Sequence, residues 1–347
     1  MQLNTIVIDA GHGGKDPGAL GKIVKEKDVV LNVALKFGNL IRDNMPDVKV
    51  VYTRNSDVFV PLDKRAEIAN KNANKNKASL FVSIHANYIS SPKISGAETF
   101  VLGAHRSQEN LEVAKKENSV ITYEDNYKVK YEGFDPNVSE SYIIFELIQD
   151  KYLDHSIEAA AKIQSHFSAT AQRYDRVVKQ AGFLVLRETS MPAVLVELGF
   201  LSNAAEEKYL ASSVGQNNLA NSLYQAFREY KHQFDAQNNL IQKGESSKLA
   251  TDNADSKSVK ASSVVYKIQV ASSATVFAKG KGILAKLPDA EYYTDGKLYK
   301  YTVGATSSYD EIVELQKSIR PKVPDCFIVA FHQGKRITIR EAQNLTK

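Results

Sequence analysis

The sequence predicts an α/β fold with a mostly parallel sheet and flanking helices, followed by a small α+β domain. Short β-branched runs alternate with longer amphipathic stretches over residues 5–235, which is typical of a parallel sheet covered by helices. A polar segment without this periodicity follows at residues 236–262. Strand and helix patterns in the order β-α-β-β-α-β then occupy residues 263–343, which is typical of a split βαβ domain.

The elements of the first domain follow from hydrophobic periodicity, taken in chain order. Apolar, β-branched runs predict strands or short apolar segments at residues 5–8, 48–53, 80–84, 96–102, 183–186 and 193–196. Apolar residues at helical spacing predict amphipathic helices at residues 26–41, 61–69, 142–167 and 217–234. We therefore assign residues 1–235 to one domain.

Residues 106–154 interrupt this pattern and predict an insertion. The segment is rich in charge and tyrosine and has a turn at residues 133–137. We expect residues 236–262 to be a flexible linker, because Asn, Gln, Ser, Lys and Asp dominate there.

The second domain contains a weak internal repeat. Residues 266–273 resemble residues 299–306, and each strand leads into a helix, at residues 276–287 and 309–319. An Asp-Gly turn within residues 292–297 predicts a hairpin between the two halves, and residues 326–331 supply a last strand.

Composition excludes several classes of function. The net charge is only +5 and the sequence has no long basic run, so we expect no nucleic-acid partner. No apolar run reaches the roughly 20 residues that cross a bilayer, and no signal peptide is visible. Cys326 is the single cysteine, which excludes an intrachain disulfide and a cysteine zinc cluster; we expect it to be a buried apolar residue.

Three apolar strands lead into residues suited to metal chemistry, namely His12, His85 and Glu197, and Glu26 follows the loop after the first strand. Ligands bind at the carboxyl edge of open α/β sheets, so these side chains are expected to meet there. Two histidines and a carboxylate are a common catalytic zinc set. A second carboxylate would carry a proton from water to a leaving nitrogen, and Glu26 and Glu197 can divide these tasks.

Several motifs resemble the zinc-dependent N-acetylmuramoyl-L-alanine amidases of bacterial cell walls, in the order in which that family has them. The matching segments are DAGHGGKDPGA at residues 9–19, EKD at 26–28, TR at 53–54 with Arg65 and residues 69–70, SIHAN at 83–87, GAET at 96–99, and residues 192–203. The resemblance covers about 235 residues.

By this resemblance, His12, Glu26 and His85 ligate zinc, and Glu197 is the catalytic carboxylate. The bond cut would be the amide between the lactyl group of N-acetylmuramic acid and L-alanine in peptidoglycan. The resemblance also implies a place in the periplasm or cell envelope and a part in daughter-cell separation. Two alternatives are a zinc peptidase that cuts stem-peptide bonds and an inactive wall-binding scaffold. The intact set of four residues argues against the scaffold.

The insertion departs from a minimal amidase. In some relatives a helical segment here covers the site until a partner displaces it, which implies a protein activator. We take residues 142–152, which include Glu146, as the candidate plug; the alternative is a helix that only packs on the surface.

The C-terminal domain resembles a SPOR domain, the module that binds glycan strands stripped of peptide. Tyr266, Tyr299 and Tyr301 are candidates for stacking on sugars, although they alternate with apolar residues and some can belong to the core.

Overall fold

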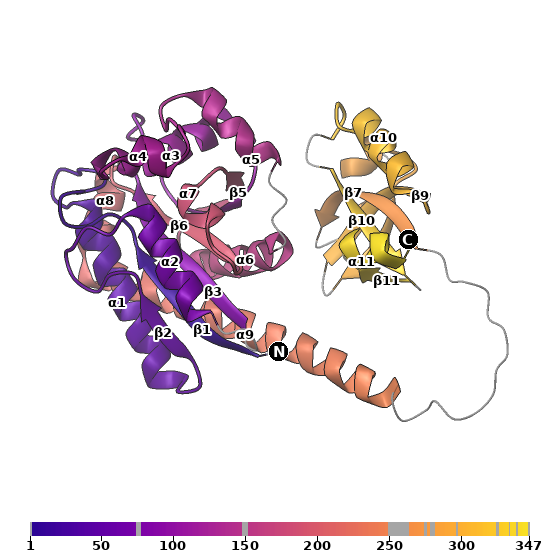
Figure 1. Cartoon of the computed structure of the whole chain (residues 1–347), viewed down its shortest axis with the longest axis horizontal. Helices are drawn as coiled ribbons and strands as arrows, with labels where there is room; N and C mark the ends of the chain where they lie inside the picture. The colour runs from indigo at the N-terminus through magenta and orange to yellow at the C-terminus, as the bar shows by residue number, and fades with distance from the viewer. Residues whose placement is uncertain are drawn as a thin grey trace. The chain divides into compact units, whose positions relative to one another are not determined.

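A computed structural model describes residues 2–73, 78–147, 152–248, 264–273, 276–277, 282–295, 298–323, 326–332, 334–337 and 339–345. The chain forms two compact units, Met1–Asp252 and Asn253–Lys347 (Figure 1). We describe each unit by itself.

A six-stranded sheet in the order β2-β1-β3-β6-β4-β5 is the centre of the first unit. Its strands are β1 (Leu3–Ala10), β2 (Lys49–Tyr52), β3 (Ala78–Asn87), β4 (Ala97–Leu102), β5 (Asp175–Ala181) and β6 (Ala193–Phe200). The four strands β2, β1, β3 and β6 are parallel, whereas β4 is antiparallel to β6 and parallel to β5. The prediction of a mostly parallel sheet is therefore confirmed.

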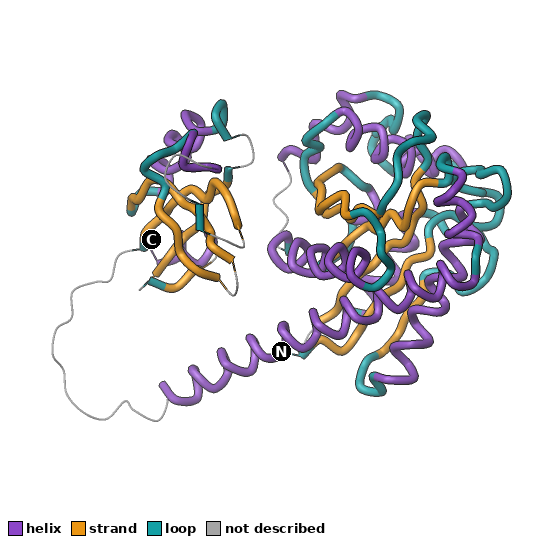
Figure 2. The backbone as a smooth tube through the Cα atoms, turned by 180° about the vertical axis from the view of Figure 1, so that it is seen from behind, coloured by secondary structure: helices purple, strands orange, loops and turns teal. Residues whose placement is uncertain are grey.

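Helices cover both faces of this sheet (Figures 1 and 2). One face packs against α1 (Glu26–Asn44), α6 (Leu153–Ala169) and α9 (Ser213–Lys248), and α8 (Ala204–Ala211) contacts α9. The other face packs against α2 (Leu62–Asn72), α7 (Leu184–Arg187) and the insertion. Strand side chains alternate between faces, so Ile6 and Ile8 join the first core and Val7 joins the second.

The insertion is folded onto the sheet and is mostly helical. It contains α3 (Gln108–Asn118), η1 (Ser119–Tyr123), α4 (Tyr127–Lys130), η2 (Ser139–Ile143) and α5 (Ile144–Leu147). Leu111, Ile121 and Tyr142 are buried in one cluster with Phe100 of β4 and Phe183, which precedes α7. This shared core fixes α3 over one end of the sheet (Figure 1).

Four predictions about the first unit need correction. The apolar run at residues 183–186 lies mostly in the helical turn α7, and the helix expected over residues 142–167 is divided among η2, α5 and α6. Strand β5 was not predicted, because it is a half-buried edge strand whose residues are mostly polar. Residues 236–248 of the expected linker continue helix α9, and residues 249–263 lie outside the described residues.

The second unit is a five-stranded antiparallel sheet in the order β11-β10-β7-β9-β8. Its elements are β7 (Val265–Ser273), η3 (Gly282–Ala285), β8 (Glu291–Asp295), β9 (Leu298–Thr306), α10 (Tyr309–Ile319), β10 (Phe327–His332), β11 (Lys335–Ile337) and α11 (Ile339–Leu345). The strands and α10 follow the split βαβ order, but where the first helix was predicted, at residues 276–287, the described residues hold only the 3-10 helix η3, and β11 and α11 were not predicted. The predicted turn lies partly outside the described residues, but pairing of Asp295 with Leu298 closes the hairpin.

Burial corrects the expectation for the tyrosine face. Tyr266 and Tyr301 are 0% and 1% exposed, so they belong to the core and cannot stack on a ligand. Tyr299 is half-buried, whereas Tyr292 is 49% exposed and packs its ring against Tyr299. Cys326 is buried, as expected. Among the described helices, none has the length and apolar character needed to cross a membrane.

Candidate functional site

The three strands that carry the predicted site are neighbours in the sheet. His12 follows the end of β1, and His85 on β3 lies in register beside Glu197 on β6. Glu26 is the first residue of α1, which begins beside the same edge. The fold thus brings all four predicted residues to the carboxyl edge of the parallel strands.

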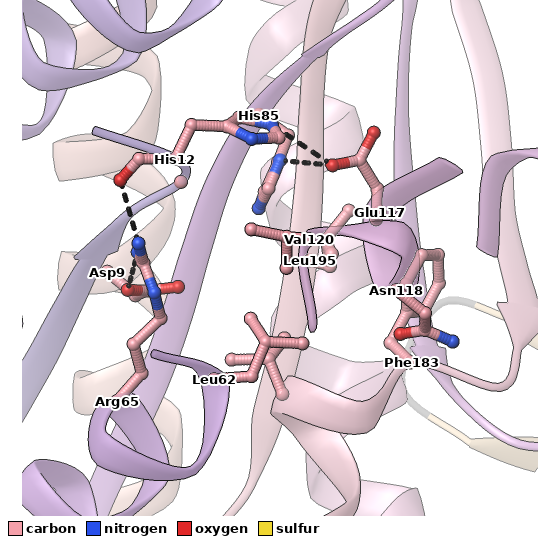
Figure 3. A pocket seen from close by; sticks show the side chains of 12 residues that line it. Asp9, His12, Leu62, Arg65, His85, Glu117, Asn118, Val120, Phe183 and Leu195 are labelled. Atoms are coloured by element: carbon pink, nitrogen blue, oxygen red, sulfur yellow. Dashed lines mark hydrogen bonds and ion pairs between the residues drawn. The ribbon is translucent and has the colours of Figure 1, made fainter. Parts of the chain in front are cut away.

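A fifth side chain, Glu117, completes a compact cluster (Figure 3). Ligand atoms of His12, Glu26, His85 and Glu117 all lie within 4.8 Å of one another, and all four residues are buried. The Glu117 Oε2 atom is 3.1 Å from His12 Nε2 and 2.9 Å from His85 Nδ1. Glu26 Oε1 is 3.1 Å from His12 Nε2 and 3.2 Å from His85 Nδ1.

Glu117 comes from α3 of the insertion and was missed by the sequence analysis. Our candidate plug was the later segment, residues 142–152 with Glu146. The side chain of Glu146 and residues 148–151 lie outside the described part of the chain, and the carboxylate that reaches the histidines belongs to α3. No local signal distinguishes Glu117 from the other glutamates of α3, because its role depends on where the helix packs.

The His12 ring is oriented from behind by Asp16. Asp16 Oδ2 lies 2.7 Å from His12 Nδ1, which leaves Nε2 directed at the cluster. Burial lowers the pKa of His12, but Glu26 and Asp16 raise it well above its ordinary value. The backbone at His12 has a φ of +60°, and Gly11 is required beside it because a Cβ there would lie 2.4 Å from the His85 ring.

Two buried arginines, Arg54 and Arg65, hold the loop that carries His12, and Figure 3 shows Arg65. Arg65 donates to the His12 carbonyl at 2.7 Å and to Asp9 Oδ1 at 2.8 Å, and Arg54 donates to the Gly11 carbonyl at 2.7 Å. Burial raises the pKa of Asp9, but Arg65 and the Thr53 hydroxyl lower it below its ordinary value overall. Asp9 is therefore a buried anion that positions Arg65.

Glu26 is held rigidly at the start of α1. Its Oε2 accepts a hydrogen bond from the Ala19 amide at 2.7 Å, and its Oε1 accepts one from the Ala86 amide at 2.9 Å. Burial raises the pKa of Glu26, but His12 and Lys116 lower it well below its ordinary value. The carboxylate is thus charged and preoriented.

Glu197 is in a different environment. It is completely buried, and neither carboxylate oxygen has a hydrogen-bond partner among the described residues. Burial and the nearby Glu117 raise its pKa well above the ordinary value, against the opposing effects of Lys116 and His85. A carboxyl group in this state can hold a proton near neutral pH.

The residues fit a zinc ion. His12 Nε2 and Glu117 Oε2 are buried and converge, yet neither makes a hydrogen bond of good geometry within the described part of the chain. Ligand atoms that lie about 2.0–2.1 Å from a tetrahedral zinc ion are about 3.3 Å from one another. The distances between the histidine nitrogens and the glutamate oxygens of the cluster, 2.9–3.2 Å, are close to this value. Nitrogen and carboxylate donors are also those that zinc prefers.

Comparisons with known proteins identify the family of this chain. The family model Amidase_3, described as N-acetylmuramoyl-L-alanine amidase, matches residues 6–229. The N-acetylmuramoyl-L-alanine amidase AmiA of Escherichia coli K12 is 32% identical over 235 residues, which cover 67% of this chain and 78% of that protein. AmiC of Escherichia coli O6:H1 is 33% identical over 226 residues, covering 65% of this chain and 52% of that protein.

A solved N-acetylmuramoyl-L-alanine amidase from Clostridium difficile 630 is 27% identical, with a TM-score of 0.48, and covers 66% of this chain and 97% of that one. The family model covers more than half of the chain, and the matched region contains His12, Glu26, His85 and Glu197. This chain therefore belongs to the N-acetylmuramoyl-L-alanine amidase family, Amidase_3.

Proposed function

We propose that the chain hydrolyses the amide between the lactyl group of N-acetylmuramic acid and L-alanine in peptidoglycan, with zinc as its cofactor. The observation that carries this proposal is the convergence of His12, Glu26 and His85 beside Glu197, a buried carboxyl group without a hydrogen-bond partner among the described residues. Family membership supports the choice of bond.

His12, Glu26 and His85 would hold the ion, and the ion would supply Lewis-acid chemistry that polarises an amide carbonyl. Glu197 accepts a proton from the attacking water and donates it to the leaving amine nitrogen. Its burial favours this exchange, since the raised pKa brings the group closer to the pH at which it must both take and give a proton.

We propose further that the insertion keeps the enzyme closed. The Glu117 carboxylate lies where a substrate carbonyl or water would have to approach His12 and His85. Asn118 fastens the end of α3, because it donates to the Gly182 carbonyl at 2.7 Å and accepts from the Leu184 amide at 2.9 Å. Opening the site therefore requires displacement of α3, and a protein activator is the partner we expect to do this.

For the second unit we propose a SPOR-like role in binding glycan strands stripped of peptide. With Tyr266 and Tyr301 in the core, Tyr299 and its exposed neighbour Tyr292 are the rings that we propose for stacking on sugar. Because peptidoglycan lies outside the cytoplasmic membrane, we place the protein in the periplasm or cell envelope, with a part in daughter-cell separation. Co-sedimentation of the full chain and its Tyr292→Ala variant with sacculi stripped of peptide tests glycan binding. Equal binding of the two proteins would show that Tyr292 does not contribute to it.

Mass spectrometry of the soluble products released from sacculi tests the main proposal. The zinc-loaded chain and its Glu117→Gln variant are each compared with the same protein carrying Glu197→Gln. Stem peptides that begin at L-alanine, absent after Glu197→Gln, are the expected result. Peptides cut elsewhere would identify a zinc peptidase, and no products even with Glu117→Gln would favour the inactive scaffold.

A further inference from the structure

A second cluster of charges lies next to Glu197 on the sheet. Glu98 on β4 is directly opposite Glu197 on β6 in an antiparallel pair. Residues so paired project from the same face of a sheet, with Cβ atoms about 4.5–5.5 Å apart. Glu98 is completely buried and accepts a hydrogen bond from Asn87 Nδ2 at 3.1 Å. This second cluster is therefore continuous with the catalytic edge.

Two cations of strand β5 meet Glu98 there. Arg176 Nε and Lys179 Nζ lie 3.0 and 2.6 Å from Glu98 Oε2. The same two side chains also contact Glu109 of α3, at 2.6 and 3.5 Å from its Oε1. The Arg176 and Lys179 side chains are only 15% and 14% exposed while α3 is in place.

Charge balance shows what displacement of α3 would leave behind. In the closed arrangement, two cations face two carboxylates. Removal of Glu109 leaves Arg176 and Lys179 with Glu98 alone, so one positive charge lacks a partner. A carboxylate or another anion would restore the balance through charge-assisted hydrogen bonds.

The position of Glu109 on α3 indicates how far an anion that replaces its carboxylate would lie from the reacting bond. Glu109 and Glu117 are eight positions apart on one helix, which corresponds to about 12 Å along its axis. Glu117 reaches the histidine pair while Glu109 reaches the basic pair. An extended peptide covers about 12 Å in three to four residues.

On the basis of the proposed amidase function, we propose that Arg176 and Lys179 form a subsite for a free carboxylate of the stem peptide. This carboxylate lies about three residues from the scissile amide. In the closed enzyme the Glu109 carboxylate occupies this subsite, so α3 blocks both the histidine pair and the subsite. Arg176 and Lys179 are then specificity-determining residues.

Calorimetric titration of the zinc-loaded double variant Glu109→Gln/Glu117→Gln tests the subsite without turnover. The probes are the stem tripeptide with a free carboxylate on its third residue and the same peptide with a carboxamide there. We expect the acid to bind at least tenfold tighter than the amide. Adding Lys179→Gln should abolish this preference and leave amide binding unchanged, and Lys179→Arg should retain it.

Equal affinity for acid and amide, no binding of the acid at millimolar concentration, or equal weakening of both peptides by Lys179→Gln would overturn the subsite.

A second measurement addresses Glu109 itself. Glu109→Gln alone should raise the basal hydrolysis of muramoyl tripeptide at least threefold, whereas Glu112→Gln should not change it. Glu112 is the matched control, since it lies on α3 with a side chain 59% exposed and an ion pair of 3.7 Å within its own helix. Equal rates for the two variants would contradict the role of Glu109 as occupant.

The two proposals fail in different ways. If muramoyl tripeptide is cleaved with the same KM whether its third residue is an acid or an amide, only the subsite is wrong. If no variant cleaves the muramoyl–alanine bond, the proposed function is wrong, and the titration still decides whether Arg176 and Lys179 bind a carboxylate.

Discussion

Replacement of Glu117 by Gln should activate the isolated enzyme. The substitution keeps the size of the side chain and removes its charge, which lies 3.1 Å from His12 Nε2, 2.9 Å from His85 Nδ1 and 3.0 Å from Lys116 Nζ. The other contacts of α3, including those of Asn118 with Gly182 and Leu184, are unchanged. The variant thus removes the charge contacts of Glu117 with His12 and His85, which favour the closed arrangement, and one contact with Lys116 of its own helix.

The magnitude follows from the close contact of the charged Glu117 carboxylate with two buried histidines. We take its energy as that of an interaction with a charged group, about 1.5–3 kcal/mol. Since about 1.4 kcal/mol changes an equilibrium constant tenfold, the fraction of open molecules should rise about 10- to 150-fold while the closed form still predominates. Turnover of a soluble muramoyl peptide should rise by the same factor, because only open molecules admit the substrate.

The assay is the initial rate of release of peptides that begin at L-alanine from a soluble muramoyl peptide by the zinc-loaded protein. Glu112→Gln is the control on the same helix, and thermal unfolding shows whether each variant is folded. An unchanged or lower rate for folded Glu117→Gln with normal zinc content would refute the reasoning that this carboxylate closes the site. A comparable increase for Glu112→Gln would show that α3 is simply loosened by any loss of charge.

Three further outcomes are expected. Glu197→Gln should lower turnover by about 10²–10⁴-fold with unchanged zinc content, measured on the Glu117→Gln background, because it removes the group that carries the proton. Asp16→Ala should weaken zinc binding about 10- to 100-fold in competition with a chelator, because Asp16 orients His12. Asp9→Asn should cost about 3–5 kcal/mol of unfolding free energy at pH 7, because buried Arg65 loses its anion. Because the folded chain lowers the pKa of Asp9, its carboxylate stabilises the fold fully above the unfolded pKa of about 4, and this stabilisation is lost as pH falls through the folded pKa. The unfolding free energy of Asp9→Asn should therefore fall less steeply with decreasing pH in the acid range.

The sequence by itself determined the fold class and the four residues at the sheet edge. Strand and helix periodicities are local properties, and His12 and His85 lie at or just beyond the ends of apolar strands that the topology of a parallel sheet places together. The residues alone left the tasks of Glu26 and Glu197 undivided, and the resemblance to the amidase family implied a different role for each. Two backbone amides donate hydrogen bonds to the Glu26 carboxylate, whereas the Glu197 carboxylate has no hydrogen-bond partner among the described residues. This difference between their environments is visible only in the folded chain.

Only the tertiary structure showed where the insertion packs and which residues it contacts. Glu109 and Glu117 lie on one amphipathic helix among other charged residues, and nothing local marks them as partners of the sheet. Their roles arise because buried side chains such as Leu111 and Ile121 pack α3 against the sheet, and that packing depends on residues far away in the sequence. Tyr266 and Tyr301 show the same limit, because the alternation of a strand identifies its two faces without indicating which of them is buried.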